Sequence, residues 1–469
     1  MKIIKYAVVY GGTALLLVSC GITKKYKRPE DLKTNNLYRG VTVTDSTTLA
    51  TTPWKELFTD NKLQDLIEKG LQNNYDLKIA LARMESAGAS LKQSKLAFLP
   101  TLTADADVTH SKPSTAQIRA NGVNAASISS YNLYALTGTT SWELDVWGKL
   151  RSNKRAAVAA YLESDAYRRV VQTQLIADIA TNYYQLTAYD EQIKIVESTI
   201  ENRGKDVEIV KELKKAAILT GSDVANSEAN LKAAILQLPD LKQSRREVEN
   251  ALSILLAVPP DSIARNTIDK QEFSLALKTG LPAQLLANRP DVQQAEFAFK
   301  NAFELTNVAR TNFYPSLTIS STGGWATANT LQSFFSQRFY GNIIAGLTQP
   351  IFNQGQNRLK LKAAKATQQE AYYNFQQALL TAGQEVSNAL YAHQMALEKE
   401  KTRALQIADL QKATDFTKEL LKYTSATNYT DVLTAEQNLL SAKLNGVGDK
   451  LQRLQSVVDL YRALGGGWQ

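Results

Sequence analysis

The stretch 131–147, YNLYALTGTTSWELDVW, decides which fold the chain can adopt. Side chains of two kinds alternate along it, as expected for a strand whose two faces meet different surroundings. One face would carry Leu136, Gly138, Thr140, Trp142, Leu144 and Val146, and the other Thr137, Thr139, Ser141, Glu143 and Asp145. The stretch 101–111 alternates in the same way, with Leu102, Ala104, Ala106 and Val108 opposed to Thr103, Asp105, Asp107 and Thr109. The sequence therefore predicts two strands, at about 101–111 and 131–147.

Helical patterns flank these two strands. Residues 63–98 are rich in Ala, Leu, Lys and Gln, and Pro100 ends that pattern. Beyond Gly148 a helical pattern runs for some 65 residues, to about 100 Å at ~1.5 Å per residue. Its heptad-like series is Leu186, Tyr189, Ile193, Val196, Ile200, Arg203, Val207 and Val210. Gly221 and Asp223 then mark a reversal into another helix, which stops before Pro259 and Pro260.

The chain contains this unit twice. FLPTL at 98–102 matches FYPSL at 313–317 with an offset of 215 residues, and Asp223 matches Asp431 with an offset of 208. Asp145-Val146-Trp147 matches Pro350-Ile351-Phe352 with an offset of 205. We expect one repeat at 61–260, a connector at 261–282 and a second repeat at 283–469. The second repeat would have strands near 316–323 and 340–351, and helices near 356–422 and 431–464.

The N-terminus resembles a bacterial lipoprotein signal. Lys2 and Lys5 precede a mostly apolar stretch at 7–18, which is too short to span a bilayer. The sequence LVSC that follows is similar to a lipobox, and Cys20 is the only cysteine of the chain. We expect residues 1–19 to be removed, Cys20 to carry the lipid and 20–60 to form a lipidated N-terminal segment. An ordinary signal peptide with an incidental thiol is the alternative.

The two faces of the strands indicate a transmembrane barrel, because apolar-out and polar-in alternation is typical of one. Four strands cannot close a barrel, and open strand edges are not tolerated in lipid. The chain would therefore share its barrel with copies of itself, as eight strands from two copies or twelve from three. A small four-stranded sheet outside the membrane is the alternative.

Four acidic residues belong to the polar face of the first two strands: Asp105, Asp107, Glu143 and Asp145. Paired carboxylates could serve glycoside hydrolysis. On the polar face of a barrel, however, they would form a solvated rim of the lumen. We expect the rim.

Composition excludes most enzyme chemistry. The 469 residues include two histidines, His110 and His393, so few ligands exist for zinc, haem or an iron–sulfur cluster. No nucleotide-binding Gly-x-x-x-x-Gly-Lys-Ser/Thr loop occurs. The net charge of +9 is spread along the helical patterns and forms no basic stripe, which argues against nucleic acid. We expect neither an enzyme nor a cofactor.

Several motifs resemble one family over essentially the whole chain from Cys20. They are WKELFTDNKLQDLIEKGLQNN at 54–74, WELDVWGKLR at 142–151, RPDV at 289–292, YPSL at 314–317 and PIF at 350–352. These are similar to TolC-like outer-membrane efflux proteins, especially the lipoprotein branch that serves resistance-nodulation-division (RND) multidrug pumps. The resemblance implies a homotrimer, with a 12-stranded β-barrel in the outer membrane that continues into a long periplasmic α-helical barrel. It further implies a passive export duct that works with a periplasmic adaptor protein and an inner-membrane RND pump.

The resemblance also implies a gate at the periplasmic helix tips, near 214–223 and 422–431. Asp431 matches an aspartate of the family's constriction, and Asp223 an acidic residue that ties helix pairs together. Lys422 and Tyr423 lie near the usual Arg and Tyr partners, shifted or exchanged. Thr434 stands where the family usually has a second aspartate. An N-cap role is the alternative for Asp431 and for Asp223, because both open helical runs.

Two other functions use similar sequence features. The outer-membrane component of a type I protein secretion system shares the fold. A coiled-coil lipoprotein that spans the periplasm without a pore would need the helices but not the two-faced strands. The alternation at 102–109 and 131–146 argues against the spacer. The lipoprotein motif and the 54–74 signature favour efflux over protein secretion.

Overall fold

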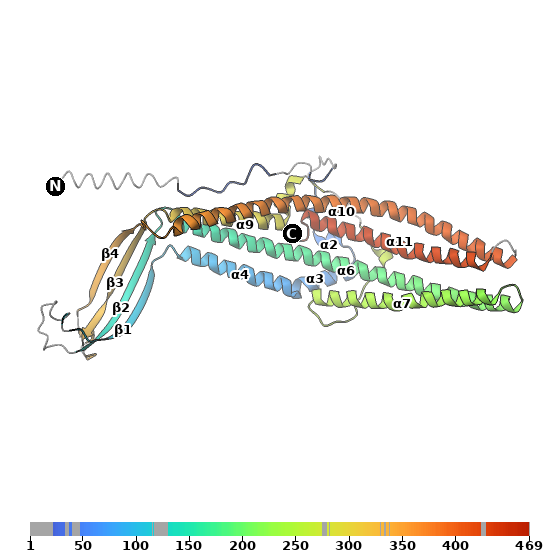
Figure 1. Ribbon diagram of the computed structural model, residues 1–469, viewed down its shortest axis with the longest axis horizontal. Coiled ribbons are helices and arrows are strands. Elements are labelled where there is room, and N and C mark those ends of the chain that lie inside the picture. The colour runs from blue at the N-terminus through green and yellow to red at the C-terminus, as the bar shows by residue number, and fades with distance from the viewer. Residues whose placement is uncertain are drawn as a thin grey trace. The chain divides into compact units, whose positions relative to one another are not determined.

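The computed structural model describes residues 22–32, 37–39, 47–114, 116, 130–273, 279–280, 282–328, 330–332, 334–336, 338–423 and 428–468. It confirms a mainly helical chain with a small β part (Figure 1). The elements in chain order are η2 (Leu49–Thr51), α2 (Trp54–Leu57), α3 (Asn61–Asn73), α4 (Tyr75–Leu96), β1 (Thr101–Ser111), β2 (Tyr131–Leu144), α6 (Lys149–Lys215), α7 (Gly221–Leu255), η3 (Ile268–Lys270), η4 (Pro282–Gln284), α8 (Leu285–Asn288), α9 (Pro290–Thr311), β3 (Ser316–Ala328), η5 (Phe334–Ser336), β4 (Tyr340–Thr348), α10 (Gln356–Tyr423) and α11 (Tyr429–Leu464).

The elements fall into two compact units. The sheet unit is formed by the described residues within 1–29, 85–162 and 296–373. The helical unit is formed by those within 30–84, 163–295 and 374–469.

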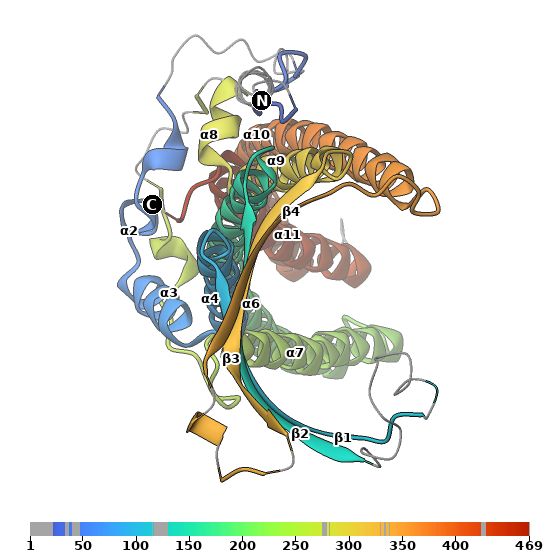
Figure 2. The ribbon, with the colours of Figure 1, turned by 90° about the vertical axis from the view of Figure 1, so that its left-hand side faces the viewer.

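The sheet unit contains one curved sheet of antiparallel strands in the order β1-β2-β3-β4 (Figure 2). The register keeps the two kinds of side chain apart, because Trp142 lies opposite Ile319 and Leu317 opposite Leu347. The side chains of Asp105 and Asp107 belong to the other face, since side chains alternate along a strand. Among the described residues no strand pairs with the outer edge of β1 or of β4. The sheet therefore has one apolar face, one polar face and two open edges.

Two strands end earlier than predicted. β2 stops at Leu144 rather than 147, because the Asp145 carboxylate accepts hydrogen bonds from the backbone N–H groups of Leu150 and Arg151 at 2.8 and 3.1 Å. Asp145 thereby caps the first turn of α6. β4 stops at Thr348 rather than 351, just before Pro350, which has no N–H for a ladder bond. β3 is longer than predicted and reaches Ala328.

The duplication is visible in equivalent hydrogen bonds. The Trp142 indole N–H donates to the carbonyl of Phe98 at 2.9 Å, and the Gln349 amide donates to the carbonyl of Phe313 at 3.4 Å. The left-handed glycines Gly148 (φ 80°) and Gly355 (φ 75°) precede α6 and α10. Both comparisons, Trp142 with Gln349 and Gly148 with Gly355, give an offset of 207 residues. The predicted match of Asp145-Val146-Trp147 to Pro350-Ile351-Phe352, at 205, is therefore displaced by two residues.

A break that the sequence analysis missed divides the first predicted helix. α3 ends at Asn73 and α4 begins at Tyr75, because the Asn74 side chain accepts a hydrogen bond from the Leu77 N–H at 3.0 Å. The same side chain donates to the Leu255 carbonyl at the end of α7. In the second repeat, buried Arg289 donates to the carbonyl of Ala463 near the end of α11 at 2.9 Å. Each repeat thus ties the residue before its second helix to the end of its last helix.

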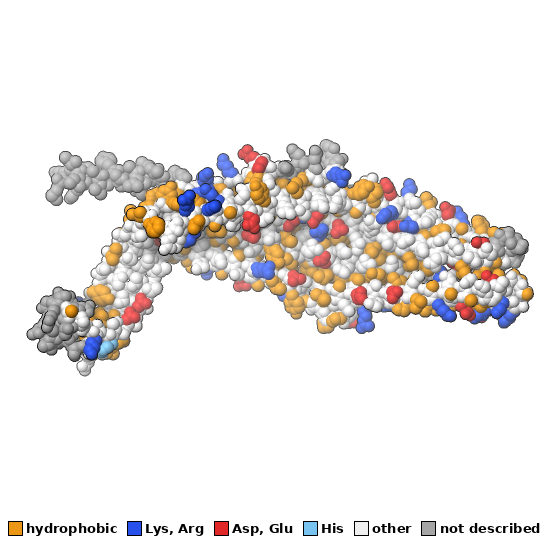
Figure 3. Space-filling view, viewed as in Figure 1, with side chains coloured by type: hydrophobic (Ala, Val, Ile, Leu, Met, Phe, Trp, Pro, Cys, Tyr) orange, Lys and Arg blue, Asp and Glu red, His pale blue; other side chains and the backbone are white. Residues whose placement is uncertain are grey.

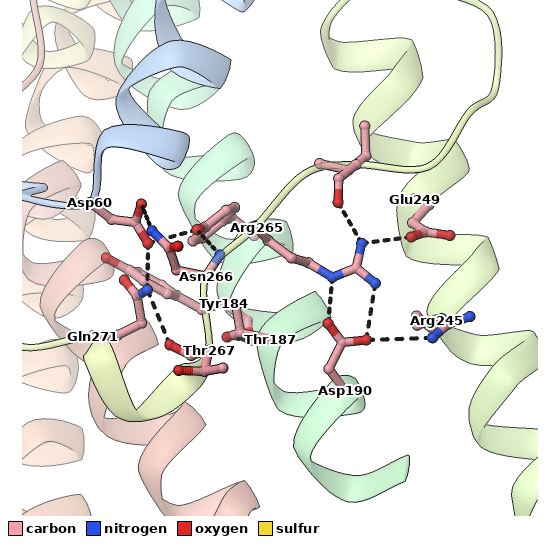
Figure 4. A network of polar contacts seen from close by, with 12 residues as sticks. Asp60, Tyr184, Thr187, Asp190, Arg245, Glu249, Arg265, Asn266, Thr267 and Gln271 are labelled. Atoms are coloured by element: carbon pink, nitrogen blue, oxygen red, sulfur yellow. Dashed lines mark hydrogen bonds and ion pairs between the residues drawn. The ribbon is translucent and has the colours of Figure 1, made fainter. Parts of the chain in front are cut away.

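The connector after α7 is fixed to the helical unit by charged groups (Figure 4). Arg265 forms ion pairs with Asp190 of α6 and Glu249 of α7, both at 2.6 Å. The Asp60 carboxylate accepts hydrogen bonds from Tyr183, Asn266 and Gln271. Burial opposes its charge, but these hydrogen bonds hold the pKa of Asp60 below its usual range.

Candidate functional site: the helix tips

The first long helix pair, α6 and α7, reverses through a capped turn. At the first reversal the Ile218 N–H donates to the Leu213 carbonyl at 2.9 Å, and Ala217 adopts a left-handed conformation with φ 58°. This motif usually has glycine at that position, since a Cβ is unfavourable there. Lys and Arg side chains gather over this end of α6 and α7 (Figure 3). Lys211 and Lys215 of α6 each pair with a glutamate one turn earlier.

Asp223 and Asp431 occupy equivalent places in two capping boxes. Thr220 is the N-cap of α7, and its backbone N–H donates to the Asp223 carboxylate at 2.8 Å. Asn428 is the N-cap of α11, and its backbone N–H donates to the Asp431 carboxylate at 3.2 Å. Both aspartates therefore stand at the third helical position, not at the N-cap itself. Their predicted part in a gate remains a prediction.

The other two predicted gate residues end α10. Lys422 and Tyr423 are its last residues, and their side chains lie outside the described part of the structure. Thr434 donates its hydroxyl to the Thr430 carbonyl one turn back in α11.

An apolar cluster joins the two helix pairs at their tips. Val210 of α6 packs with Tyr429 and Val432 of α11, all three buried. Leu219, Val224, Leu421 and Leu433 pack around them. The Tyr429 hydroxyl lies 2.7 Å from the Ser227 hydroxyl of α7. The cluster thus holds α7 and α11 together by apolar packing and by one hydroxyl–hydroxyl hydrogen bond.

A charged junction follows, further from the tips. Lys418 of α10 forms ion pairs with Asp206 of α6 at 2.8 Å and with Glu436 of α11 at 2.5 Å. Burial opposes the charge of Lys418, but both carboxylates hold its pKa above the usual range. Burial, reinforced by neighbouring Asp206, raises the pKa of Glu436. We call Asp206, Lys418 and Glu436, together with Arg203, the tip junction.

Arg203 completes the tip junction from α6. Its guanidinium donates to the Asn230 carbonyl of α7 at 2.8 Å and to the Gln437 side chain of α11 at 3.0 Å. It is 3% exposed, and burial lowers its pKa, although a guanidinium stays protonated. Among the described residues, the Arg203 Nε and the Asn230 Nδ2 have no hydrogen-bond partner. The junction is therefore incompletely satisfied.

Sequence analysis identified none of the four members of the tip junction. Lys418 and Asp206 are 212 residues apart, and nothing local marks them as a pair. Arg203 did give a signal, since it is the one charged residue in an apolar heptad series. A charge at such a position needs a buried partner.

Two of the four predicted rim residues lie on β1, and the other two lie where β2 leads into α6. Asp105 and Asp107 are exposed on β1. Glu143 forms an ion pair with Lys149 at 2.9 Å. Asp145 lies beyond the end of β2, where it caps α6 and pairs with Arg151 at 2.8 Å. The structure therefore gives Glu143 and Asp145 partners at the strand–helix junction.

Cys20 lies outside the described residues. The segment that follows is held along α9, where the Asn307 side chain bonds both the N–H and the carbonyl of Lys24, at 3.1 and 2.8 Å. Arg28 pairs with Glu296 at 2.6 Å. These contacts hold Lys24 and Arg28, which lie a few residues beyond the predicted lipid anchor, against α9.

The histidines take part in ordinary polar contacts. His393 Nδ1 lies 3.1 Å from the Ser456 hydroxyl, and His110 Nδ1 lies 2.8 Å from the Asn132 side chain. The described residues contain no group of three His, Cys, Asp or Glu side chains placed to hold a metal. Within the same residues, no helix combines the length and apolar character that crossing a membrane requires.

Outer-membrane export channels combine three features of this chain. They have a sheet with one polar face, two pairs of long helices and an internal duplication. The Outer membrane efflux protein family matches residues 66–258 and 281–466, one segment for each repeat. The chain belongs to this family, and it is an outer-membrane efflux channel protein.

Named relatives agree with this assignment. The chain is 27% identical to the probable efflux pump outer membrane protein TtgC of Pseudomonas putida, over 97% of this chain and 94% of the relative. It is also 27% identical to the probable outer membrane lipoprotein SilC of Salmonella typhimurium, over 97% of each. Among solved structures, the open state of the MtrE channel of Neisseria gonorrhoeae superposes with a TM-score of 0.83. The two sequences are 26% identical, and the match covers 96% of this chain and 99% of the MtrE chain.

Proposed function

We propose that the protein is the passive export duct of a tripartite efflux pump. Three copies would form a 12-stranded barrel, and a periplasmic adaptor and an inner-membrane RND-type pump would deliver the cargo. Cys20 would be lipidated after removal of residues 1–19 and would anchor the chain in the outer membrane. The protein would carry out no catalysis and need no cofactor, because the pump supplies the energy.

The two faces of the sheet are the observation that supports this proposal most strongly. Its strands contain no Lys or Arg, and their side chains divide into an apolar and a polar face. Leu102 and Ile343, on the apolar face of the edge strands, are both 77% exposed. Such a surface is stable where lipid covers the apolar face and water fills the other side. The open edges of β1 and β4 supply the reason for more than one copy.

The helix tips would form the gate. Three symmetry-related Asp431 carboxylates that converge on one axis would repel one another and favour cations. Asp223, Lys422 and Tyr423 would contribute contacts between helix pairs. The tip junction would hold each copy closed with a few contacts, so a docked adaptor needs only a modest differential affinity to open it.

Dye accumulation in cells tests the proposed function. A strain without this protein is compared with the same strain after the gene is restored, using a hydrophobic fluorescent dye. The proposal predicts that the deletion retains dye and that restoration clears it. Equal accumulation would contradict the role in drug efflux. Loss of a secreted protein from the medium of the deletion strain would then support type I secretion.

A further inference from the structure

The helix α10 begins with an exposed run of cations. Residues 358–365 contain Arg358, Lys360, Lys362 and Lys365 and no Asp or Glu. All four cationic side chains are exposed, and none forms an ion pair with a residue that the structure describes. Arg358, Lys362 and Lys365 are spaced by four and three residues, so they share one face of α10, and we call them the basic stripe. Lys360 lies on the opposite side of the helix.

The internal duplication shows that Arg358 lacks the partner that its counterpart has. At the offset of 207 residues, Arg358 corresponds to Arg151 in the first turn of α6. Arg151 forms an ion pair with Asp145 at 2.8 Å. In the second repeat Phe352 takes the place of Asp145, so no carboxylate stands there for Arg358.

The same comparison holds for Lys362. It corresponds to Arg155, which pairs with the buried Glu304 of α9 at 2.8 Å. Residues of α9 correspond to those of α4 at the offset of 215, which places Ala89 where Glu304 stands. The duplication therefore supplies no carboxylate for Lys362 at that place, either in this chain or in another copy of it. Among the described residues, the second repeat has unpaired cations where the first repeat has ion pairs.

The basic stripe lies on the side of α10 along which the N-terminal segment, residues 22–32, runs. Tyr372 continues the stripe, and its ring packs against Phe299 of α9 with the centroids 5.6 Å apart. Phe299 in turn packs against Tyr26 of the N-terminal segment at 5.7 Å. Figure 3 shows Lys and Arg side chains gathered near the start of α10. The N-terminal segment thus follows this helix face and leaves the basic stripe exposed.

The basic stripe begins where the sheet ends. β4 stops at Thr348, and Gly355 precedes α10. The stripe extends from three to ten residues beyond Gly355, which is about 4–15 Å along the helix at ~1.5 Å per residue. The polar layer of a bilayer is about 5–8 Å thick on each side, and long cationic side chains keep their charge in such a layer. With the sheet in the outer membrane, the basic stripe therefore lies level with the head groups of the inner leaflet.

The N-terminal segment brings three more cations to this level. Lys24, Lys25 and Lys27 are exposed, and none of them forms an ion pair with a described residue. Thr23 packs against Gly148, the glycine at the start of α6 that corresponds to the one before α10. The three lysines therefore follow directly on the residue that marks the end of the sheet.

We propose that the basic stripe and these three lysines bind the anionic head groups of phospholipids in the inner leaflet of the outer membrane. Clusters of about four to eight Lys and Arg directly beside a membrane-spanning segment attract anionic lipid. A free phosphate ion offers the same chemistry, but the lipid fits better because the surface lies level with the head groups. Together with a lipid on Cys20, this surface would supply the two attachments that stable anchoring needs. Such binding is separate from the export role, since it requires only the outer-membrane location.

Native mass spectrometry of the purified full-length protein tests this proposal. The protein is mixed with equal amounts of phosphatidylglycerol and phosphatidylethanolamine, and the ratio of the two retained lipids is measured. We expect the wild type to retain phosphatidylglycerol in at least tenfold excess. The double variant Arg358→Gln/Lys362→Gln should lower that ratio by at least about fivefold, the usual effect of one cation beside an anionic surface.

Two further variants separate the stripe from net charge and from folding. Lys360→Gln removes an exposed, unpaired cation from the opposite side of the same helix and should change the ratio by less than about twofold. Lys362→Arg keeps the charge and should retain the wild-type ratio. The same spectra show whether each variant keeps the native mass of the wild type.

Three results would overturn the proposal. The first is equal retention of the two lipids by the wild type. The second is a loss of preference in Lys360→Gln as large as in the double variant, because the effect would then come from net charge alone. The third is displacement of phosphatidylglycerol by an equal concentration of inorganic phosphate, which would identify a free anion as the ligand.

Discussion

Lys418→Met removes the charge at the centre of the tip junction. Lys418 lies between Asp206 at 2.8 Å and Glu436 at 2.5 Å, so it joins α10 to α6 and to α11. Methionine keeps the length and apolar stem of the side chain but cannot donate. It would leave the two carboxylates facing each other without the hydrogen bonds and ion pairs that Lys418 gives them. We therefore expect the substitution to favour separation of the helix tips.

The size of the effect follows from two charge-assisted hydrogen bonds. Each such bond contributes about 1.5–3 kcal/mol. The Lys418 side chain is 33% exposed, so water replaces part of this and screens the remaining repulsion. We expect a net loss of about 2 kcal/mol for the closed state, which is about a 30-fold change in the ratio of open to closed channels.

Single-channel recording in planar bilayers measures that ratio. Lys412→Met is the matched control on the same helix, because Lys412 forms only an exposed pair with Asp409 at 3.6 Å. The control should change the ratio by less than about twofold. The reasoning is refuted if Lys418→Met opens no more often than Lys412→Met while both proteins insert normally.

Four further predictions concern single residues. Cys20→Ala should abolish palmitate labelling and leave trimers; persistent labelling would disprove the lipobox. Asp431→Ala should raise single-channel conductance, and an unchanged conductance would reduce Asp431 to its role in the capping box. Asp60→Asn should destabilise the protein more at pH 7 than at pH 3, because a lowered pKa gives stability above the ordinary carboxyl range that is lost on acidification; equal changes in melting temperature would contradict this. Ala217→Gly should relieve about 1 kcal/mol of left-handed strain and slow amide hydrogen exchange at the first reversal; faster exchange would argue against strain.

The sequence was most informative where one period dominates. Alternation predicted β1 and β2, the internal duplication predicted β3 and β4, and the change of pattern at Gly148 located the start of α6. Side-chain capping is less visible, because nothing in the sequence shows that the Asn74 side chain accepts from the Leu77 N–H and donates to the Leu255 carbonyl. Asp145 likewise continues the alternation in the sequence. It lies outside the strand, because two backbone N–H groups of the next helix donate hydrogen bonds to its carboxylate.

Long-range contacts account for what the sequence could not predict in the site. The two capping-box aspartates could be located from the repeat, since Asp223 and Asp431 occupy equivalent positions in the two repeats. The tip junction could not, because it depends on how four helices meet. Arg203 carried the one local signal, as a charge within an apolar series, and its role was not predicted. The offset between β2 and β4 required the hydrogen-bond register, because two residues of slip leave the pattern of faces unchanged.

The central claim is that copies of this chain form a water-filled duct through the outer membrane. The most direct test is conductance of purified protein of determined native mass in planar bilayers, with wild type and Lys418→Met measured side by side. The account predicts a trimeric mass, discrete conductance steps and far more frequent opening in the variant. A trimer that inserts but conducts in neither form would contradict it.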